Sequence, residues 1–423
     1  MAFSDYATWI KTAAALFAVS GLTLCACSSS DSQGTTLPET GGAGGTAQDS
    51  GGSGGGTSDP FANAAFPGID TSVVSAGIAP DGCLGGFDPA TEKLTLKLSS
   101  AGSALLLAIS GSEIQANGVT CTSPSGEKAT TANTAFIQVD GGDGAQTVIV
   151  DLSTGDFGTK ILGVAGGINL DLAGGDDTAM LRTTEQDDTV RAGTSAGKAT
   201  LGVGTGTTGN VWFTGVERLV VSLGPGKDSF SAGSASGFEG PSALSISVFA
   251  GAGDDSVQGG NGDDALNGNE GDDSFDEGDA DNGGDTINGG PDQGNTVSYE
   301  RRTLGLSVTM CASSQPEGCA SPTCNCDADD GASDEHDNLI NVFHFIGGTK
   351  GDTVTGTPGN DTIDGRDGDD YLYGIGGADT LYGGEGADTL DTGAGADYAD
   401  CGGSDMDIAV VTSEDTVLNC ELF

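Results

Sequence analysis

The chain is poor in basic residues. Its 423 residues include 14 lysines and arginines against 62 aspartates and glutamates, which gives a formal net charge of -48. Nonspecific binding to nucleic acid is therefore excluded, because it requires a basic surface that neutralises phosphates. The same charge opposes direct adsorption of the polypeptide to an anionic membrane.

Histidine is equally scarce, since His336 and His344 are the only two in the chain. Neither belongs to an H-E-x-x-H zinc-protease motif. The short matches to enzyme motifs at 193–197 (G-x-S-x-G) and 204–209 (a dinucleotide-binding glycine pattern) lack the strand, turn and helix that such motifs need. We therefore predict that the protein is not an enzyme and has no catalytic residues.

The chain also lacks an apolar run at its N-terminus that is long enough to span a bilayer comfortably. Residues 12–24, TAAALFAVSGLTL, have the length of the apolar region of a signal peptide. The run ends in Leu24-Cys25-Ala26-Cys27-Ser28, which resembles a bacterial lipobox. The resemblance implies a signal peptide over 1–26, lipid attachment at Cys27 and anchoring to the outer membrane at the cell surface. An ordinary secretory signal is the alternative.

Residues 27–60 are rich in glycine and serine, which is typical of a flexible tether. They contain Leu37-Pro38-Glu39-Thr40-Gly41, which is identical to a sortase motif. Sortase substrates carry that motif near the C-terminus, before an apolar span and a basic tail. We interpret the match as a coincidence.

Glycine and aspartate, in contrast, are abundant and recur at a fixed interval. Aspartates stand nine residues apart in two blocks, the first at Asp255, Asp264 and Asp273, the second at Asp352, Asp361, Asp370, Asp379, Asp388 and Asp397. Each copy follows Gly-Gly-x-Gly-x-Asp-x-U-x, where U is a large apolar residue, as in GGEGADTLD from Gly383. This period predicts a parallel β-helix in which glycines form the turns and U faces inward. Two units make one coil, so residues eighteen apart are expected to stack.

The pattern resembles the RTX, or hemolysin-type, calcium-binding repeat family over 250–298 and 347–400. The resemblance implies an all-β fold, a right-handed parallel β-roll (β-helix), that binds several Ca²⁺ ions through aspartates and turn glycines. Carried over to this chain, the expected ligands are Asp255, Asp264, Asp273, Asp285, Asp352, Asp361, Asp370, Asp379, Asp388, Asp397, Gly251, Gly253, Gly260, Gly262, Gly383, Gly384 and Gly386. Asp285 follows Asp273 after twelve residues, and Asn295 takes the next aspartate position.

Oxygen ligands of this kind are those that calcium prefers. Stacked carboxylates repel one another without a cation, so we expect folding and calcium binding to be coupled. The acids one position earlier, Asp254, Asp263, Asp272 and Asp369, are expected at the solvated surface. The alternative is a metal-free Gly/Asp linker, which would not need apolar residues in strict register.

The rest of the chain divides around these blocks. Alternating runs such as EKLTLKLSS predict a small β domain of short strands over 61–139. Decayed repeats, with glutamine at the aspartate position in GGDGAQTVI, predict degenerate coils with incomplete metal sites over 140–249. Residues 299–346 are expected to form a disulfide-rich insertion, and residues 401–423 a C-terminal cap.

Eight cysteines follow the expected lipidation site, at Cys83, Cys121, Cys311, Cys319, Cys324, Cys326, Cys401 and Cys420. An even number in an exported chain favours disulfides. Position along the chain suggests the pairs Cys83–Cys121 and Cys401–Cys420, the second of which would staple the cap. The clustered four lack the paired C-x₂-C spacing of a zinc site.

These observations favour a calcium-binding lipoprotein at the cell surface, whose β-roll has a structural or adhesive role. A surface glycan or protein is a possible partner, although no motif identifies one. The alternative is an extracellular hydrolase or lyase that uses the coils as a scaffold for a catalytic region at 60–240. A toxin exported by a type I system is disfavoured, because such proteins lack an N-terminal signal.

Overall fold

The structure is a computed structural model that describes residues 67–69, 71, 73–98, 102–163, 166–204, 209–233, 238–280, 282–312, 330–332, 335–403 and 406–422. The expected signal peptide, the lipidation site Cys27 and the tether lie outside these residues, as do Cys319, Cys324 and Cys326. Within the described part, the one helix is the short α2 (Gly158–Ile161). No described helix is long and apolar enough to cross a membrane.

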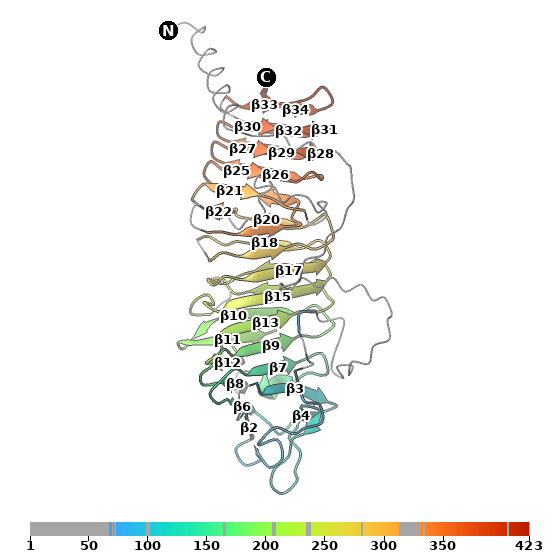
Figure 1. The fold of residues 1–423 in the computed structure, drawn as a ribbon, viewed down its shortest axis with the longest axis vertical. Helices are drawn as coiled ribbons and strands as arrows, with labels where there is room; N and C mark the ends of the chain where they lie inside the picture. Colours follow the sequence, from blue (N-terminus) through green and yellow to red (C-terminus); the bar gives the residue numbers. More distant parts are fainter. Residues whose placement is uncertain are drawn as a thin grey trace, which may run out of the picture. The chain divides into compact units, whose positions relative to one another are not determined.

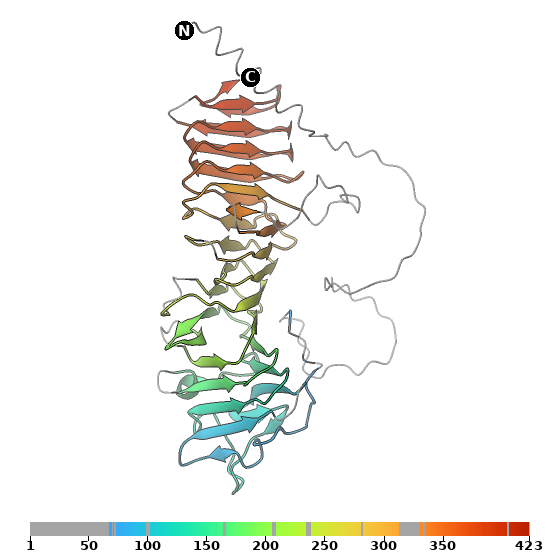
Figure 2. The same ribbon diagram turned by 60° about the vertical axis from the view of Figure 1, so that its left-hand side comes forward.

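The described residues form successive coils of short strands that stack into parallel sheets, as Figures 1 and 2 show. The largest sheet contains, in spatial order, β1 (Phe87–Asp88), β2 (Lys93–Lys97), β6 (Phe136–Asp140), β8 (Gly167–Asp171), β12 (Val211–Thr214), β11 (Lys198–Val203), β10 (Thr189–Ser195), β14 (Ser229–Ser231), β16 (Ser256–Gln258), β18 (Ser274–Asp276), β20 (Thr296–Ser298), β24 (His344–Ile346), β26 (Thr362–Asp367), β29 (Thr380–Glu385), β32 (Tyr398–Gly402) and β34 (Thr416–Leu418). We call it the long sheet.

Two further sheets hold the second strand of each coil. The upstream sheet contains β23 (Asn338–Ile340), β19 (Thr286–Asn288), β17 (Ala265–Glu270), β15 (Ser245–Ala252), β13 (Arg218–Ser222), β9 (Thr178–Arg182), β7 (Thr147–Asp151), β3 (Ala104–Ser110), β4 (Glu113–Ala116) and β5 (Val119–Thr120). The downstream sheet contains β22 (Gly331–Ala332), β21 (Leu306–Thr309), β25 (Thr353–Thr355), β27 (Tyr371–Tyr373), β30 (Thr389–Asp391), β33 (Ile408–Val410) and β35 (Glu421–Leu422). A small pair joins β28 (Gly376–Gly377) to β31 (Ala394–Gly395).

The register of the repeats is the eighteen-residue step expected from two nine-residue units. Along the long sheet, Thr362 pairs with Thr380, Thr380 with Tyr398 and Tyr398 with Thr416. Each nine-residue unit therefore supplies one strand, and alternate units supply alternate faces of the coil. The parallel β-roll predicted from the period is confirmed.

The apolar U positions face inward, as predicted. Seven of these side chains are completely buried: Val257, Leu266, Phe275, Ile363, Leu372, Leu381 and Leu390. Together with the upstream strands they form one continuous core cluster that runs from Cys83 to Ala409. Side chains alternate across a strand, so a three-residue strand buries one of them and exposes its neighbours on both sides.

The expected boundary between a small β domain and the solenoid, at residues 139 and 140, falls inside β6. This strand pairs in parallel with β2 on one side and with β8 on the other. The hairpin of β3 and β4 likewise joins the sheet through parallel pairing of β3 with β7. The coiled arrangement therefore already includes β2 and β3.

Disulfides occur at both ends of the core. The expected pairs Cys83–Cys121 and Cys401–Cys420 are both confirmed. Cys311 is also disulfide-bonded. In the C-terminal segment expected to act as a cap, β33, β34 and β35 continue the parallel pairing of the coils beneath them.

Candidate calcium sites

The repeat aspartates occupy one position in the fold, directly before a strand. Asp370 precedes β27, Asp379 precedes β29 and Asp388 precedes β30. All ten aspartates expected as ligands are almost completely buried, with at most 3% of their surface exposed: Asp255, Asp264, Asp273, Asp285, Asp352, Asp361, Asp370, Asp379, Asp388 and Asp397. The turns therefore hold their carboxylates inside the stack.

One oxygen of each carboxylate takes part in a ladder of hydrogen bonds between coils. The backbone N–H of Asp352 donates to Asp370 Oδ1 at 2.7 Å, and that of Asp370 donates to Asp388 Oδ1 at 2.9 Å. On the other face of the coil, Asp361 donates in the same way to Asp379, and Asp379 donates to Asp397. Two ladders thus run up the stack and orient each carboxylate identically.

The second oxygen of most of these carboxylates has no hydrogen-bond partner although it is buried. This holds for Oδ2 of Asp228, Asp255, Asp273, Asp370, Asp379, Asp388 and Asp397. A buried charged oxygen without a partner is strongly unfavourable, so these atoms require a cation. Asp264, Asp352 and Asp361 differ, because a backbone N–H of their own turn donates to Oδ2.

A backbone carbonyl lies close to four of these orphaned oxygens, those of Asp273, Asp370, Asp379 and Asp388. A Cβ placed on Gly365 would lie 2.2 Å from Asp370 Oδ2 and 2.9 Å from the carbonyl oxygen of Gly383. The same construction on Gly383 meets Asp388 Oδ2 at 2.4 Å and the Cys401 carbonyl oxygen at 2.7 Å. Each of these four repeats therefore surrounds a small space, kept open by its first glycine, with carboxylate and carbonyl oxygens. This donor set fits calcium.

One repeat shows what happens when the aspartate is replaced by an amide. Asn295 keeps the ladder, because its Oδ1 accepts from the N–H of Asp273 at 2.9 Å. Its Nδ2 takes the place of Oδ2 and donates to the carbonyl oxygens of Asp292 at 2.7 Å and Asn341 at 3.2 Å. An N–H donor there satisfies the carbonyls that a cation would otherwise bind. An aspartate at this position has no N–H to donate, so the neighbouring carbonyl oxygens lack the donor that Asn295 provides.

The ionisation of the repeat aspartates reflects the same missing partner. Burial, aided by the negative charges of Asp352 and Asp388 and opposed by a backbone hydrogen bond, raises the pKa of Asp370 from 3.8 to about 7. Burial likewise raises the pKa of Asp379 to about 6, with a contribution from Asp397. Neighbouring carboxylates in the ladder therefore favour protons or a cation between them.

The glycines expected to contribute carbonyl oxygens all lie at the turns. Gly251 and Gly253 lie at the end of β15 and just after it, and Gly260 and Gly262 lie between β16 and β17; Gly383, Gly384 and Gly386 lie at the end of β29 and just after it. Gly386 has a φ of +143°, and a Cβ there would lie 1.7 Å from the carbonyl oxygen of Gly368. A side chain at this position is excluded by both the backbone conformation and the approach of the next coil.

The acids one position before the ligands are exposed, as expected: Asp254, Asp263, Asp272 and Asp369. They also have a structural role that the sequence did not reveal. Asp369 Oδ1 accepts from the N–H of Ala387 at 3.0 Å, and Asp254 Oδ1 accepts from that of Asp272 at 3.3 Å. These bonds form an outer ladder over the same eighteen-residue step.

Four aspartates outside the expected set continue the inner ladders. Asp407 Oδ1 accepts from the N–H of Asp388, and Asp415 Oδ1 accepts from that of Asp397. Asp337 and Asp228 do the same for Asp285 and Asp188. All four carry the Asp-x-apolar signature that could have identified them, as at Asp337-Asn338-Leu339 and Asp415-Thr416-Val417.

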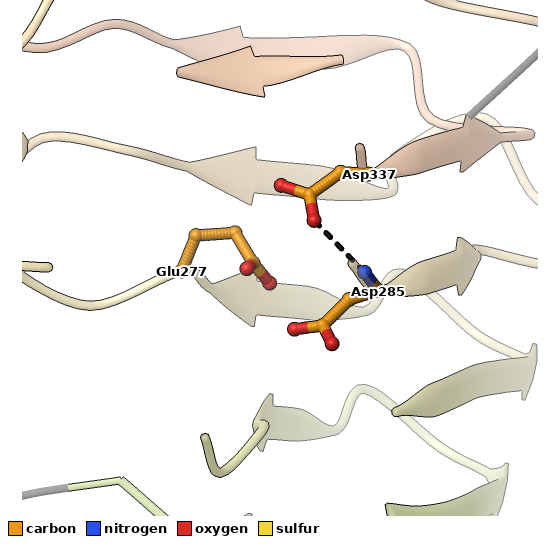
Figure 3. A group of neighbouring side chains, drawn as sticks. All are labelled: Glu277, Asp285 and Asp337. Atoms are coloured by element: carbon orange, nitrogen blue, oxygen red, sulfur yellow. Dashed lines mark hydrogen bonds between the residues drawn. The ribbon is translucent and has the colours of Figure 1, made fainter. Parts of the chain in front are cut away.

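Asp285, the least regular of the expected ligands, joins the ladder through Oδ1, which accepts from the N–H of Asp264 at 2.9 Å. Its Oδ2 accepts from Asn282 Nδ2 at 2.9 Å. Figure 3 shows Asp285 together with Glu277 and Asp337. Burial and the charge of Glu277 raise the pKa of Asp285 to about 10.

The comparison with protein families agrees with this geometry. A model of the RTX calcium-binding nonapeptide repeat matches residues 247–275, 346–378 and 376–399, in four copies. These matches overlap both blocks of regular nine-residue repeats. A comparison with curated proteins finds no match to the chain.

Proposed function

We propose that this chain, which carries RTX calcium-binding nonapeptide repeats, is a cell-surface protein that calcium folds into a β-roll with a structural or adhesive role. Several Ca²⁺ ions bind between the coils, each through a repeat aspartate and turn carbonyls. The ligands are the ten expected aspartates and the turn glycines of their repeats. Calcium at extracellular concentrations suits such sites, which bind at about 10⁻⁴–10⁻³ M in extracellular modules.

The orphaned Oδ2 atoms carry this proposal. Four successive repeats place such an oxygen in the stack, at Asp370, Asp379, Asp388 and Asp397. Carbonyl oxygens lie close to those of Asp370, Asp379 and Asp388, and Asn295 supplies a donor where the carboxylate is absent. Calcium binding satisfies all four at once, which stabilises the stack as a rigid unit.

Features of the sequence support the proposed location and role. The lipobox at Leu24–Ser28 supports attachment of a lipid at Cys27, and the tether over 27–60 would hold the β-roll away from the membrane. The eight later cysteines support an oxidising compartment. A rigid, acidic β-roll in this position serves as a spacer or as a surface for glycan or protein partners.

We propose a noncatalytic role. Both histidines lie downstream of residues 60–240, the region in which an enzyme of this architecture would need its catalytic residues. Two carboxylates of that region, Asp177 and Asp228, have a raised pKa. Both accept a ladder hydrogen bond from a backbone N–H of another coil. No observation on these residues favours the hydrolase or lyase alternative.

A matched pair of variants tests the calcium sites. Asp379→Asn keeps a ladder acceptor but replaces the orphaned oxygen by an amide, whereas Asp369→Asn makes the same change at an exposed neighbour position. In a calcium titration followed by circular dichroism and calorimetry, we expect Asp379→Asn to bind one ion fewer. Its transition should need roughly tenfold more calcium, or about 1.4 kcal/mol.

The control Asp369→Asn should bind calcium as the unmodified chain does. If both variants titrate like the unmodified chain, the ligand assignment is wrong. If the unmodified chain binds no calcium, the proposed function itself is wrong.

A further inference from the structure

A second kind of acidic site lies where the repeats are interrupted. The ladder step between Asp264 and Asp285 is 21 residues, and that between Asp285 and Asp337 is 52 residues. Glu277, which follows β18 and stands where the regular repeats have their first glycine, projects toward these two aspartates (Figure 3). One oxygen from each of the three carboxylates lies within 4.8 Å of the others, and all three side chains are fully buried.

The nearby arginine does not neutralise this group. Arg302 is 3% exposed; its Nη1 forms an ion pair with Glu335, and its Nε donates to the backbone carbonyl of Glu277 at 3.1 Å. The Glu277 carboxylate is 4.0 Å from Arg302 Nη2, which donates to Asn282 Oδ1 at 2.6 Å. Four buried carboxyl groups therefore share one guanidinium, so they cannot all be ionised without a further cation.

One oxygen of the group has no partner at all. Glu277 Oε2 accepts from Asn282 Nδ2 at 3.0 Å, but Glu277 Oε1 is buried without any hydrogen bond. The other two carboxylates are held in place, because Asp285 accepts from Asn282 and Asp337 Oδ2 accepts from the Tyr299 hydroxyl at 2.8 Å. The arrangement is thus a set of oriented carboxylates around an unsatisfied oxygen, which is the requirement of a cation site.

We infer that Glu277, Asp285 and Asp337 bind one further calcium ion, distinct in composition from the repeat sites. A hard divalent cation suits a group with only oxygen donors and net negative charge. Such an ion would connect the end of β18 with the starts of β19 and β23, and so join the coils on both sides of the interruption. This inference extends the proposed function from the regular repeats to the junction between the two blocks.

Tyr299 makes the site observable. Terbium(III) replaces calcium in oxygen sites and emits light when a nearby tyrosine is excited, and the Tyr299 hydroxyl touches a proposed ligand. Glu277→Gln removes the charge of Glu277 but keeps its size, and Tyr299→Phe removes the sensitiser but leaves the three carboxylates. Asp379→Asn, in a regular repeat, is the control.

We expect the full chain with Glu277→Gln to bind one equivalent of calcium fewer than the unmodified chain in equilibrium dialysis. Terbium emission excited through tyrosine should lose the same component in Glu277→Gln and Tyr299→Phe, with no further loss in the double variant. Asp379→Asn should keep this component and lose a different equivalent. Circular dichroism in calcium checks that each variant is folded.

An unchanged calcium stoichiometry in folded Glu277→Gln overturns the inference, and shows that the carboxyl groups share protons instead. Emission that is unchanged in Tyr299→Phe overturns it as well, even if Glu277→Gln fails to fold. The two proposals are tested separately by Asp379→Asn, which should lose one calcium equivalent of the repeats while it keeps the ion that depends on Glu277. If only the Glu277-dependent ion binds to the unmodified chain, the repeat sites fail while this site stands.

Discussion

The upstream coils and the regular repeats build the same stack from very different strands. In the upstream sheet, β7 buries Val148, Ile149 and Val150 within five residues. In the downstream sheet, β27 has three residues and buries only Leu372 between two tyrosines. Because burying one such side chain contributes about 1.5–3 kcal/mol, the upstream coils gain several times more from their core.

The turns of the two regions also differ, in whether the side chain at the aspartate position can donate hydrogen bonds. Where a repeat has aspartate, Gln146 of the upstream turn donates from Nε2 to the carbonyl oxygens of Gly142, at 2.9 Å, and Gly144. The regular repeats have Asp370 and its successors there, whose Oδ2 atoms have no donor. This upstream turn therefore supplies N–H donors of its own, whereas the downstream turns hold carboxylates that a cation would satisfy. The contrast is one of degree, because Oδ2 of Asp177 and Oδ2 of Asp228 in the upstream coils also have no hydrogen-bond partner. The upstream coils thus combine a larger core with fewer unsatisfied carboxylates, and the downstream coils combine a smaller core with more of them.

The largest expected effect of this difference is on the pH dependence without calcium. Burial raises the pKa of Asp370 to about 7 and that of Asp388 to about 6, from 3.8 in the unfolded chain. The folded chain thus holds these protons more tightly than the unfolded chain, which stabilises it at low pH. This stabilisation is fully present below about pH 4 and is lost as the pH rises through 6 to 7.

In a chelator, we therefore expect the melting temperature of the downstream coils to fall between about pH 4 and pH 7. Calcium affinity should rise over the same interval, because calcium competes with those protons. Differential scanning calorimetry at several pH values checks both. A metal-free melting temperature that rises over this interval contradicts the assignment.

The next largest effect concerns the core. Leu372→Ala removes the one buried apolar side chain of β27, and Leu181→Ala removes one of the two in β9. Each should cost about 2–5 kcal/mol. Only Leu372→Ala should raise the calcium concentration at the folding midpoint, because only the downstream coils couple folding to calcium. Equal shifts of this midpoint in both variants would show that the two regions fold as one unit.

The smallest effect is expected from a substitution that replaces an amide in the ladder by a carboxylate. Asn295→Asp replaces the self-satisfied amide by a carboxylate in the ladder, so we expect one additional calcium equivalent and a slightly less stable metal-free state. Asn261→Asp adds the same charge at an exposed turn position and serves as the control. Isothermal titration calorimetry measures the stoichiometry; no extra equivalent in Asn295→Asp means that aspartate in the ladder is not sufficient for a site.

The nine-residue period was enough to predict the strands, the inward U residues and the stacking of the regular aspartates. It failed where the spacing changes. Asp407 follows Asp388 by 19 residues rather than 18, and Asp337 reaches the ladder only after an insertion of the chain. Glu277 could not be recognised, because it stands at the first-glycine position, which supplies no side-chain ligand in the regular repeat, and it approaches Asp285 only through the irregular turn that precedes β19. Contacts created by an interruption depend on its path in space, which a period does not encode.

Hydrogen exchange of the full chain, followed by mass spectrometry with calcium and with a chelator, tests the central claim most directly. The result we predict is that amides in β25–β34 lose protection when calcium is removed, while amides in β6–β13 keep it. Unchanged protection in β25–β34 would contradict a calcium requirement for the repeats. Loss of protection along the whole stack would contradict the independence of the upstream coils.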